Sequence, residues 1–541
     1  MGSVRAAVTL LGLVLAVVLY VPIAPLGFEP EPDLSFHATT HDAFARHLQM
    51  GSDIVSTYGP WGILQRGFDR RTDAAMLAVS ALLAMAFAWG AAGIVPHAGA
   101  VTVAALLVAM GRHDARFTAL AVLLILSTLL PPSPARELPL AAILGVVALI
   151  KFPLLVFALF AVTMAAITRR TVAHVLVFGA AFLAAWMAAG QHLGGLPLFV
   201  ARQIEVAGGY AGASATGSAA IGAAAAAALL LLIVLAERDP LPSIALGGTI
   251  IYVAKAGYVR SDIEHAGAAS AILLLLAAGY IAIRRRWRVV LVAVAVIAVV
   301  AGAPLFADRL LADAAWMRDR PRRVAALEQQ LLVLTENGLP PVRESIDSFP
   351  AGSAGLIARS LRYTPRPVFW SYMVWTPALG RLNADFLRGP RAPEWLWVTV
   401  DSLDGRLPLL DDAPSWLEML RRYDVATTTR DHLLLRKRVA PRRAPPGAVW
   451  CTIEFHPSIA RRITDFVFRP APVTLETTTA TGARTTWRIS PAMAAGGFLL
   501  SPQVGNVDEL RLLFAGDDRN RVAQVRVHGG GDATLHMAAV Q

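Results

Sequence analysis

Residues 74–95 read AAMLAVSALLAMAFAWGAAGIV and carry no charged side chain. A helix needs about 20 consecutive apolar residues to cross the hydrocarbon core of a bilayer, so this run predicts a membrane-spanning helix. Further runs of the same character lie on both sides of it, and several of them are short. Together they predict eleven spans: 4–24, 74–95, 98–111, 117–130, 138–150, 153–168, 172–190, 217–236, 241–258, 265–283 and 288–306.

The composition divides the chain into two parts. Of all residues 56% are hydrophobic and 16% are charged, and the mean hydropathy is +0.54, but the apolar residues are concentrated before residue 307. We therefore predict a polytopic α-helical transmembrane domain at 1–306 and an extracytoplasmic α/β domain at 307–440. Prolines between 441 and 446 mark a linker. Short strand-like runs after it predict a β-sandwich domain at 441–541.

The arginines of the N-terminal part sort its loops onto two sides. Cytoplasmic loops of membrane proteins carry an excess of Lys and Arg. With the N-terminus inside, the inner loops collect Arg136, Arg169, Arg170, Arg238, Arg284, Arg285, Arg286 and Arg288. The prediction is a multi-pass protein of the bacterial inner membrane with a cytoplasmic N-terminus and an extracytoplasmic C-terminal region. We expect 4–24 to be a retained span, because no small-x-small cleavage site follows it.

The net charge of +11 does not indicate a nucleic-acid partner. The arginines flank apolar segments, as membrane topology requires, and form no long basic face of the kind that binds nucleic acid. Cys451 is the only cysteine in the sequence, so no disulfide can form within the chain. The C-terminal region must therefore be stabilised by its core alone.

The predicted outer loop at 25–73 contains the most informative polar stretch, THDAFARHLQMGSDIVSTYGPWGILQRGF at 40–68. Residues 41–50 predict a short helix with Asp42 in its first turn, where the helix dipole favours a carboxylate. Asp53 follows in an extended piece, and a turn begins at Tyr58. Two interpretations stay open. Asp42 and Asp53 only cap and solvate the loop, or one of them is a general base at the membrane surface.

This stretch resembles the first outer loop of the GT-C superfamily of membrane glycosyltransferases, in particular the bacterial aminoarabinose and mannosyl transferases. The shared pattern is an acidic residue, an aromatic residue, Ala-Arg, Gly-x-Asp and a later proline. In this sequence it consists of Asp42, Phe44, Ala45-Arg46, Gly51, Asp53 and Pro60. The chain departs from the superfamily at Ala43, where the second member of an acidic pair is expected.

Two further segments resemble the same superfamily in the same order. GRHDARFTAL at 111–120 is similar to its Arg-x-Asp-Ala turn and supplies Asp114. LGVVALIKFP at 144–153 is similar to its Leu-Gly-x-x-x-Leu-x-Lys-Gly-Pro element, with Lys151 and Pro153 matched and Phe152 in place of glycine. Lysine between two apolar runs is costly in a membrane and usually functional.

The resemblance implies transfer of a sugar from a polyprenyl-phosphate donor to a glycan, lipid or protein acceptor at the outer membrane face. Asp42 would then be the first candidate for the catalytic base, followed by Asp53 and Asp114. Cations at the outer ends of predicted spans would stabilise the donor phosphate: Lys151, Lys255, Arg260 and His265. Residues of the outer loops complete the predicted substrate site: Tyr58, Arg202 and Tyr210. For Lys255 the structural alternative is snorkelling to the interface. For 191–216 two interpretations stay open, an amphipathic segment at the membrane interface and a plain connecting loop.

No metal-ligand motif is present, so no cofactor is predicted, although the acidic residues leave a divalent cation open. The predicted partners are the lipid-linked donor, membrane lipids and a glycan or lipid acceptor. One rival hypothesis is a non-catalytic assembly protein for envelope polysaccharide, which the substitution at Ala43 favours. The other is a transporter or flippase, against which no inverted repeat is evident.

Overall fold

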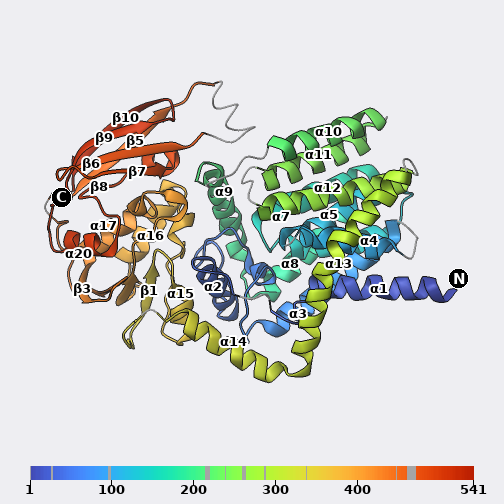
Figure 1. Ribbon diagram of the computed structural model, residues 1–541, viewed down its shortest axis with the longest axis horizontal. Coiled ribbons are helices and arrows are strands. Elements are labelled where there is room, and N and C mark those ends of the chain that lie inside the picture. Colours follow the sequence, from blue (N-terminus) through green and yellow to red (C-terminus); the bar gives the residue numbers. More distant parts are fainter. Residues whose placement is uncertain are drawn as a thin grey trace.

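The computed structural model describes residues 2–25, 28–94, 99–111, 113–213, 220–237, 239–258, 263–284, 288–336, 338–445, 447–459 and 471–540. Figure 1 shows an all-helical part at the N-terminal end of the chain and a region with all of the sheets at the C-terminal end. The helices of the N-terminal part are α1 (Gly2–Tyr20), α2 (Asp33–Ala45), η1 (Pro60–Leu64), α3 (Asp73–Ile94), α4 (Ala100–Ala109), α5 (His113–Thr128), α6 (Pro134–Val147), α7 (Phe152–Arg169), α8 (Ala173–Ala188), η2 (Leu193–Gly195), α9 (Leu196–Ala213), α10 (Ala220–Ala236), α11 (Pro240–Tyr258), α12 (Ile263–Arg284) and α13 (Arg288–Arg318).

The chain is a membrane protein, and its described residues contain fewer span-length helices than the eleven that the sequence predicts. Among the described residues, four helices are long and apolar enough to cross a bilayer, in α3, α7, α12 and α13, and the bent pair of α8 and α9 would make a fifth. The eleven-span prediction is therefore not confirmed. Several predicted spans form short helices, such as α4 with 10 residues and α6 with 14. At 1.5 Å per residue these are too short for a hydrocarbon core of about 30 Å.

Helix α5 lies at the centre of the helical part. It packs against α3, α6, α7 and α12, and every residue from Leu120 to Leu126 is at most 2% exposed. Because α5 is covered by protein on all sides, its apolar sequence is explained by the core as well as by the membrane.

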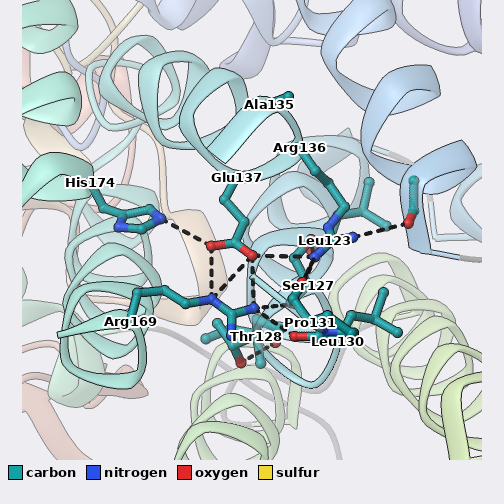
Figure 2. A network of polar contacts seen from close by, with 12 residues as sticks. Leu123, Ser127, Thr128, Leu130, Pro131, Ala135, Arg136, Glu137, Arg169 and His174 are labelled. Carbon is teal, nitrogen blue, oxygen red and sulfur yellow. Dashed lines mark hydrogen bonds and ion pairs between the residues drawn. The ribbon is translucent and has the colours of Figure 1, made fainter. Parts of the chain in front are cut away.

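Ion pairs mark both ends of the parallel helices α5 and α7. At one end Asp114, in the first turn of α5, meets Lys151, the residue before α7. At the other end Glu137 binds Arg169, Arg136 and His174 (Figure 2). The α5 helix has 16 residues, so the two ends are about 24 Å apart. The arginines that the sequence places on the inner side thus include two that share one buried carboxylate.

The first part of the C-terminal region combines a mixed sheet with helices. Its strands have the order β1-β2-β4-β3, and only the β1–β2 pair is parallel. Helix α13 continues through the predicted boundary at 306/307 to Arg318 and is followed by α14. The elements are α14 (Arg320–Leu334), β1 (Ile346–Phe349), α15 (Ser353–Ala358), η3 (Ser371–Met373), α16 (Pro377–Arg388), β2 (Trp395–Val398), η4 (Leu403–Gly405), η5 (Pro408–Leu410), α17 (Ala413–Arg422), β3 (Tyr423–Thr428) and β4 (Leu433–Lys437).

The last hundred residues form two three-stranded sheets, β10-β5-β8 and β7-β6-β9. All described pairings in them are antiparallel. Buried side chains from both sheets, such as Ile453 and Leu475, belong to one apolar cluster. The elements are β5 (Val449–His456), β6 (Val473–Thr479), β7 (Arg484–Ile489), α19 (Pro491–Gly496), β8 (Phe498–Ser501), α20 (Val507–Phe514), β9 (Val522–His528) and β10 (Asp532–Ala539).

Helix α2 joins the helical part to the sheet region. It begins at Asp33, earlier than the helix predicted at 41–50, and ends at Ala45, before His47 takes a positive φ of 54°. It packs against α15, and Thr39 Oγ1 lies 2.7 Å from Ser353 Oγ. Asp42 therefore stands near the end of a buried helix and not in a first turn.

Candidate functional site

The ion pair between Asp114 and Lys151 is the centre of the candidate site. Lys151 Nζ lies 2.8 Å from Asp114 Oδ2. The Lys151 side chain is 21% exposed and that of Asp114 is 31% exposed, so the pair is reachable from outside the protein. Both residues lie at the N-terminal ends of their helices, where backbone dipoles favour an anion. An ammonium has three donors, and Asp114 accepts one of them.

The loop before η1 holds this pair from one side. The Gly59 amide donates to Ile150 O at 3.0 Å, and the Trp61 amide donates to Leu149 O at 3.0 Å. A Cβ at Gly59 would lie 2.4 Å from Leu149 O, so only glycine permits this approach. The loop consequently forms a β-bridge between Tyr58 and Lys151.

Two side chains of this loop segment contact the pair. The Tyr58 ring centroid lies 5.7 Å from Lys151 Nζ. The Gln65 amide donates to Asp114 Oδ1 at 2.6 Å. Both carboxylate oxygens of Asp114 therefore accept a hydrogen bond, one from Lys151 and one from Gln65.

The electrostatic environment keeps Asp114 ionised. Burial raises its pKa, but the Lys151 ammonium, the Gln65 amide and His265 outweigh that effect and hold the pKa at about 2. For Lys151 burial lowers the pKa, and Asp114 and Tyr58 overcompensate, so the pKa is raised. Both groups are charged across the physiological pH range, which suits recognition of an anion by Lys151.

The structure brings some of the predicted site residues together and leaves others apart. The structure brings Tyr58, Asp114 and Lys151 into contact. His265 helps to lower the pKa of Asp114, and Tyr210 helps to raise the pKa of Lys151.

Asp42 and Asp53 occupy other ionic contacts. Asp42 is only 7% exposed and binds Arg46 Nη1 at 2.8 Å and Arg71 Nη2 at 3.0 Å through different oxygens. Asp53 binds Arg391 of the sheet region at 2.7 Å. Their catalytic roles stay predictions.

No contact described here joins the other predicted residues within the described part of the chain, Arg202 and Lys255, to the pair. Arg202 lies in α9, and its buried Nε atom has no hydrogen-bond partner. Lys255 lies in the last turn of α11. Arg260 lies outside the described residues.

Sequence reasoning missed Gln65 and the aromatic residues that approach Tyr58. The ring centroid of Phe36 in α2 lies 4.8 Å from that of Tyr58 and 5.3 Å from that of Trp370. The ring centroids of Trp370 and Tyr372 are 5.1 Å apart. The aromatic richness of this segment was visible in the sequence, but its place beside Tyr58 depends on how the sheet region docks. No local signal distinguishes Gln65 from other loop glutamines.

No protein family matches the sequence, and no curated protein matches it either. Two solved structures are similar in chain course. ArnT from Cupriavidus metallidurans bound to undecaprenyl phosphate is 12% identical, with a TM-score of 0.39 over 81% of this chain and 98% of that one. The Archaeoglobus fulgidus oligosaccharyltransferase in complex with Zn and sulfate is 10% identical, with a TM-score of 0.34 over 97% of this chain and 98% of that one.

Because both TM-scores are below 0.5, we base the functional conclusion on the geometry around Lys151 and not on these structures. Among the described residues, no group of three His, Cys, Asp or Glu side chains is arranged to hold a metal ion. The divalent cation therefore stays an open prediction.

Proposed function

We propose that this chain is a glycosyltransferase that moves a sugar from a polyprenyl-phosphate donor to a glycan, lipid or protein acceptor. The observation that carries the proposal is the partly exposed Lys151–Asp114 pair at the N-terminal ends of α5 and α7. A lipid-linked phosphate is an anion held at a membrane surface. A lysine at the end of a membrane helix, next to two helix N-termini, has the charge and the place to bind it.

The aromatic residues around Tyr58 support a sugar substrate. Tyr58, Trp370 and Tyr210 are each partly exposed, and they come from the loop before η1, the sheet region and α9. Tyr210 packs edge-on against Trp375 with ring centroids 5.1 Å apart. Aromatic rings with a polar edge pack well against the apolar faces of a sugar. We place the transferred sugar between Lys151 and these rings.

In the proposed reaction an acceptor hydroxyl attacks the anomeric carbon of the donor. The bond from that carbon to the phosphate oxygen breaks, and the electron pair leaves on the polyprenyl phosphate, whose added charge Lys151 stabilises. The hydroxyl proton passes to a carboxylate. Asp114 is the nearest carboxylate to Lys151. A phosphate that draws the ammonium away would remove the largest attraction that lowers the pKa of Asp114, making it a stronger base.

The test is sugar transfer or donor hydrolysis by purified protein in nanodiscs, with a panel of polyprenyl-phosphate sugars. We expect Asp114→Asn to lower turnover about 100-fold or more, the range of general-base catalysis. Asp508→Asn is the matched control, because Asp508 is 80% exposed on α20. Asp42→Asn tests the rival base. If wild-type protein neither transfers nor hydrolyses any donor in the panel, the enzyme proposal fails and the assembly-protein hypothesis replaces it.

A further inference from the structure

Helix α9 does not run in the direction of the helix before it. The break between α8 and α9 bends the chain by 109°. In Figure 1, α9 runs crosswise at the boundary between the helical part and the sheet region. An apolar helix that turns sideways at this boundary lies along the surface of the helical part and does not continue through it.

One face of α9 exposes apolar residues, and the acidic residue in the same arc, Glu205, is only partly exposed and accepts a hydrogen bond from Thr376 of the sheet region. Positions at helical spacing along it are exposed, with Leu198 at 40% and Ile204 at 60%, and Ala201 and Gly208 continue the same stripe. None of these residues is polar or charged. A helix that faced water along this stripe would be expected to carry charged side chains there.

The opposite face of α9 is fixed to the protein. The Phe199 ring lies 5.0 Å from that of Trp186, and the Gln203 amide donates to Ser56 O at 2.9 Å. A Cβ at Gly209 would lie 2.5 Å from the Trp375 Cβ, which shows how closely α9 approaches the sheet region. The exposed stripe is therefore the side of the helix that the rest of the chain leaves uncovered.

We propose that α9 is an interfacial helix whose exposed stripe, Leu198, Ala201, Ile204 and Gly208, lies in the lipid of the membrane surface. Exposed apolar side chains also precede the stripe in the chain, on α8, where Leu183 is 40% and Met187 is 51% exposed, and at Leu193, which is 51% exposed. A bilayer covers such a surface without any partner protein, because amphipathic helices bury their apolar face at the headgroup boundary. This inference stands independently of the glycosyltransferase proposal.

The membrane contact of α9 has a consequence for the candidate site. Tyr210 lies on the same helix as the stripe but packs toward Trp375, and it acts on the charge of Lys151. With the stripe in lipid, α9 lies between the bilayer and the Lys151–Asp114 pair. The pair is then held at the level of the lipid headgroups.

Spin labels on engineered cysteines test this placement directly. Cys451 is the only cysteine and is fully buried, so wild-type protein provides the unlabelled blank. We would label Leu198→Cys, Ala201→Cys and Ile204→Cys one at a time in nanodiscs. Electron paramagnetic resonance then measures the collision rate of each label with lipid-soluble O2 and with a water-soluble nickel chelate. Asp508→Cys, at a position 80% exposed, is the aqueous control.

We expect all three stripe labels to collide more with O2 and less with the nickel chelate than the label at 508. Labels at the stripe that match the control would show that this face is in water and would overturn the proposal. Labels shielded from both reagents would also overturn it, because they would indicate a protein partner or a second copy of the chain on this face. Each variant is on the exposed surface, so none disturbs the contacts that fix α9.

Discussion

At the scale of single residues, Asp114 and Lys151 show what the sequence can and cannot predict. Each stood out as a charged residue beside an apolar run in a segment similar to the GT-C superfamily. Their contact at 2.8 Å could not be predicted, because it depends on α5 and α7 packing in parallel with their N-terminal ends together. Asp42 was also singled out by the sequence, but the structure places it in ion pairs away from Lys151. The sequence does not reveal that Arg71, 29 positions later, occupies one of its oxygens.

Gly59 is expected to be irreplaceable in the loop before η1. In Gly59→Ala the new methyl group would lie 2.4 Å from Leu149 O and push the loop away from Lys151. We expect a loss of about 1–3 kcal/mol of stability, as for other overpacked positions, together with weaker polyprenyl-phosphate binding. Gly194→Ala is the control, because nothing lies within 4 Å of a Cβ there. Equal melting temperatures and equal binding for the two variants would contradict this account of the loop.

His41 is expected to make stability depend on pH. Burial lowers its pKa from 6.5 to about 4, more than its contacts raise it. The unfolded chain therefore takes up a proton below pH 6.5, while the folded protein does not until about pH 4. The free energy of unfolding should fall as the pH drops through this window, by up to roughly 3 kcal/mol from this residue.

The measurement for His41 is a comparison of melting temperatures at pH 7.5 and pH 5. His41→Gln cannot titrate, so acidification should lower the melting temperature of the variant less than that of the wild type. The difference between the two proteins removes the contribution of other titrating groups. An equal drop in both would refute the role of His41.

At the scale of helices, the apolar runs located the helices well, but among the described residues only four helices, or five with the bent pair, are long and apolar enough to cross a bilayer. A hydropathy pattern cannot distinguish a short helix buried by its neighbours from one that crosses a bilayer. Helix α5 illustrates the ambiguity, because its apolar residues are covered by α3, α6, α7 and α12. For 191–216 the sequence left an amphipathic interfacial segment and a plain connecting loop open, and it gave no sign of the sharp bend after α8.

The Glu137 network is expected to hold the ends of α5, α6, α7 and α8 together. Glu137 is 1% exposed and binds Arg169 at 2.7 Å and His174 at 3.2 Å (Figure 2). Glu137→Gln would leave buried cations without a counter-charge, which typically costs about 3–5 kcal/mol. We expect a clear drop in melting temperature.

Glu328→Gln is the matched control for Glu137→Gln. Glu328 pairs with Arg70 at 3.1 Å, but both side chains are well exposed, at 46% and 67%. Exposed pairs contribute about 1 kcal/mol or less, so this variant should melt close to the wild type. If the two substitutions lowered the melting temperature equally, the Glu137 network would not hold the ends of these helices together more strongly than an exposed ion pair does.

At the scale of the whole molecule, the candidate site lies where the helical part meets the sheet region. The sequence predicted the two parts from their composition. It did not predict that α2 would be buried between them, or that Trp370 would reach Phe36 beside Tyr58. Contacts between parts far apart in the chain, such as Asp53 with Arg391, leave no local pattern to detect. The site is therefore a property of the assembled molecule.

The central claim is that Lys151 binds the phosphate of a lipid-linked donor at the membrane surface. The most direct measurement is the dissociation constant of a polyprenyl phosphate without sugar for protein in nanodiscs, comparing wild type with Lys151→Ala and Lys151→Arg. Lys437→Ala is the matched control, because Lys437 is on β4 and bonds to Ala392 O in the sheet region. Melting temperatures show whether each variant is folded.

A hydrogen bond to a charged group contributes about 1.5–3 kcal/mol. We therefore predict that Lys151→Ala raises the dissociation constant about 10- to 100-fold, that Lys151→Arg restores part of the affinity, and that Lys437→Ala leaves it unchanged. Folded Lys151→Ala protein that binds the polyprenyl phosphate as tightly as the wild type would contradict the claim.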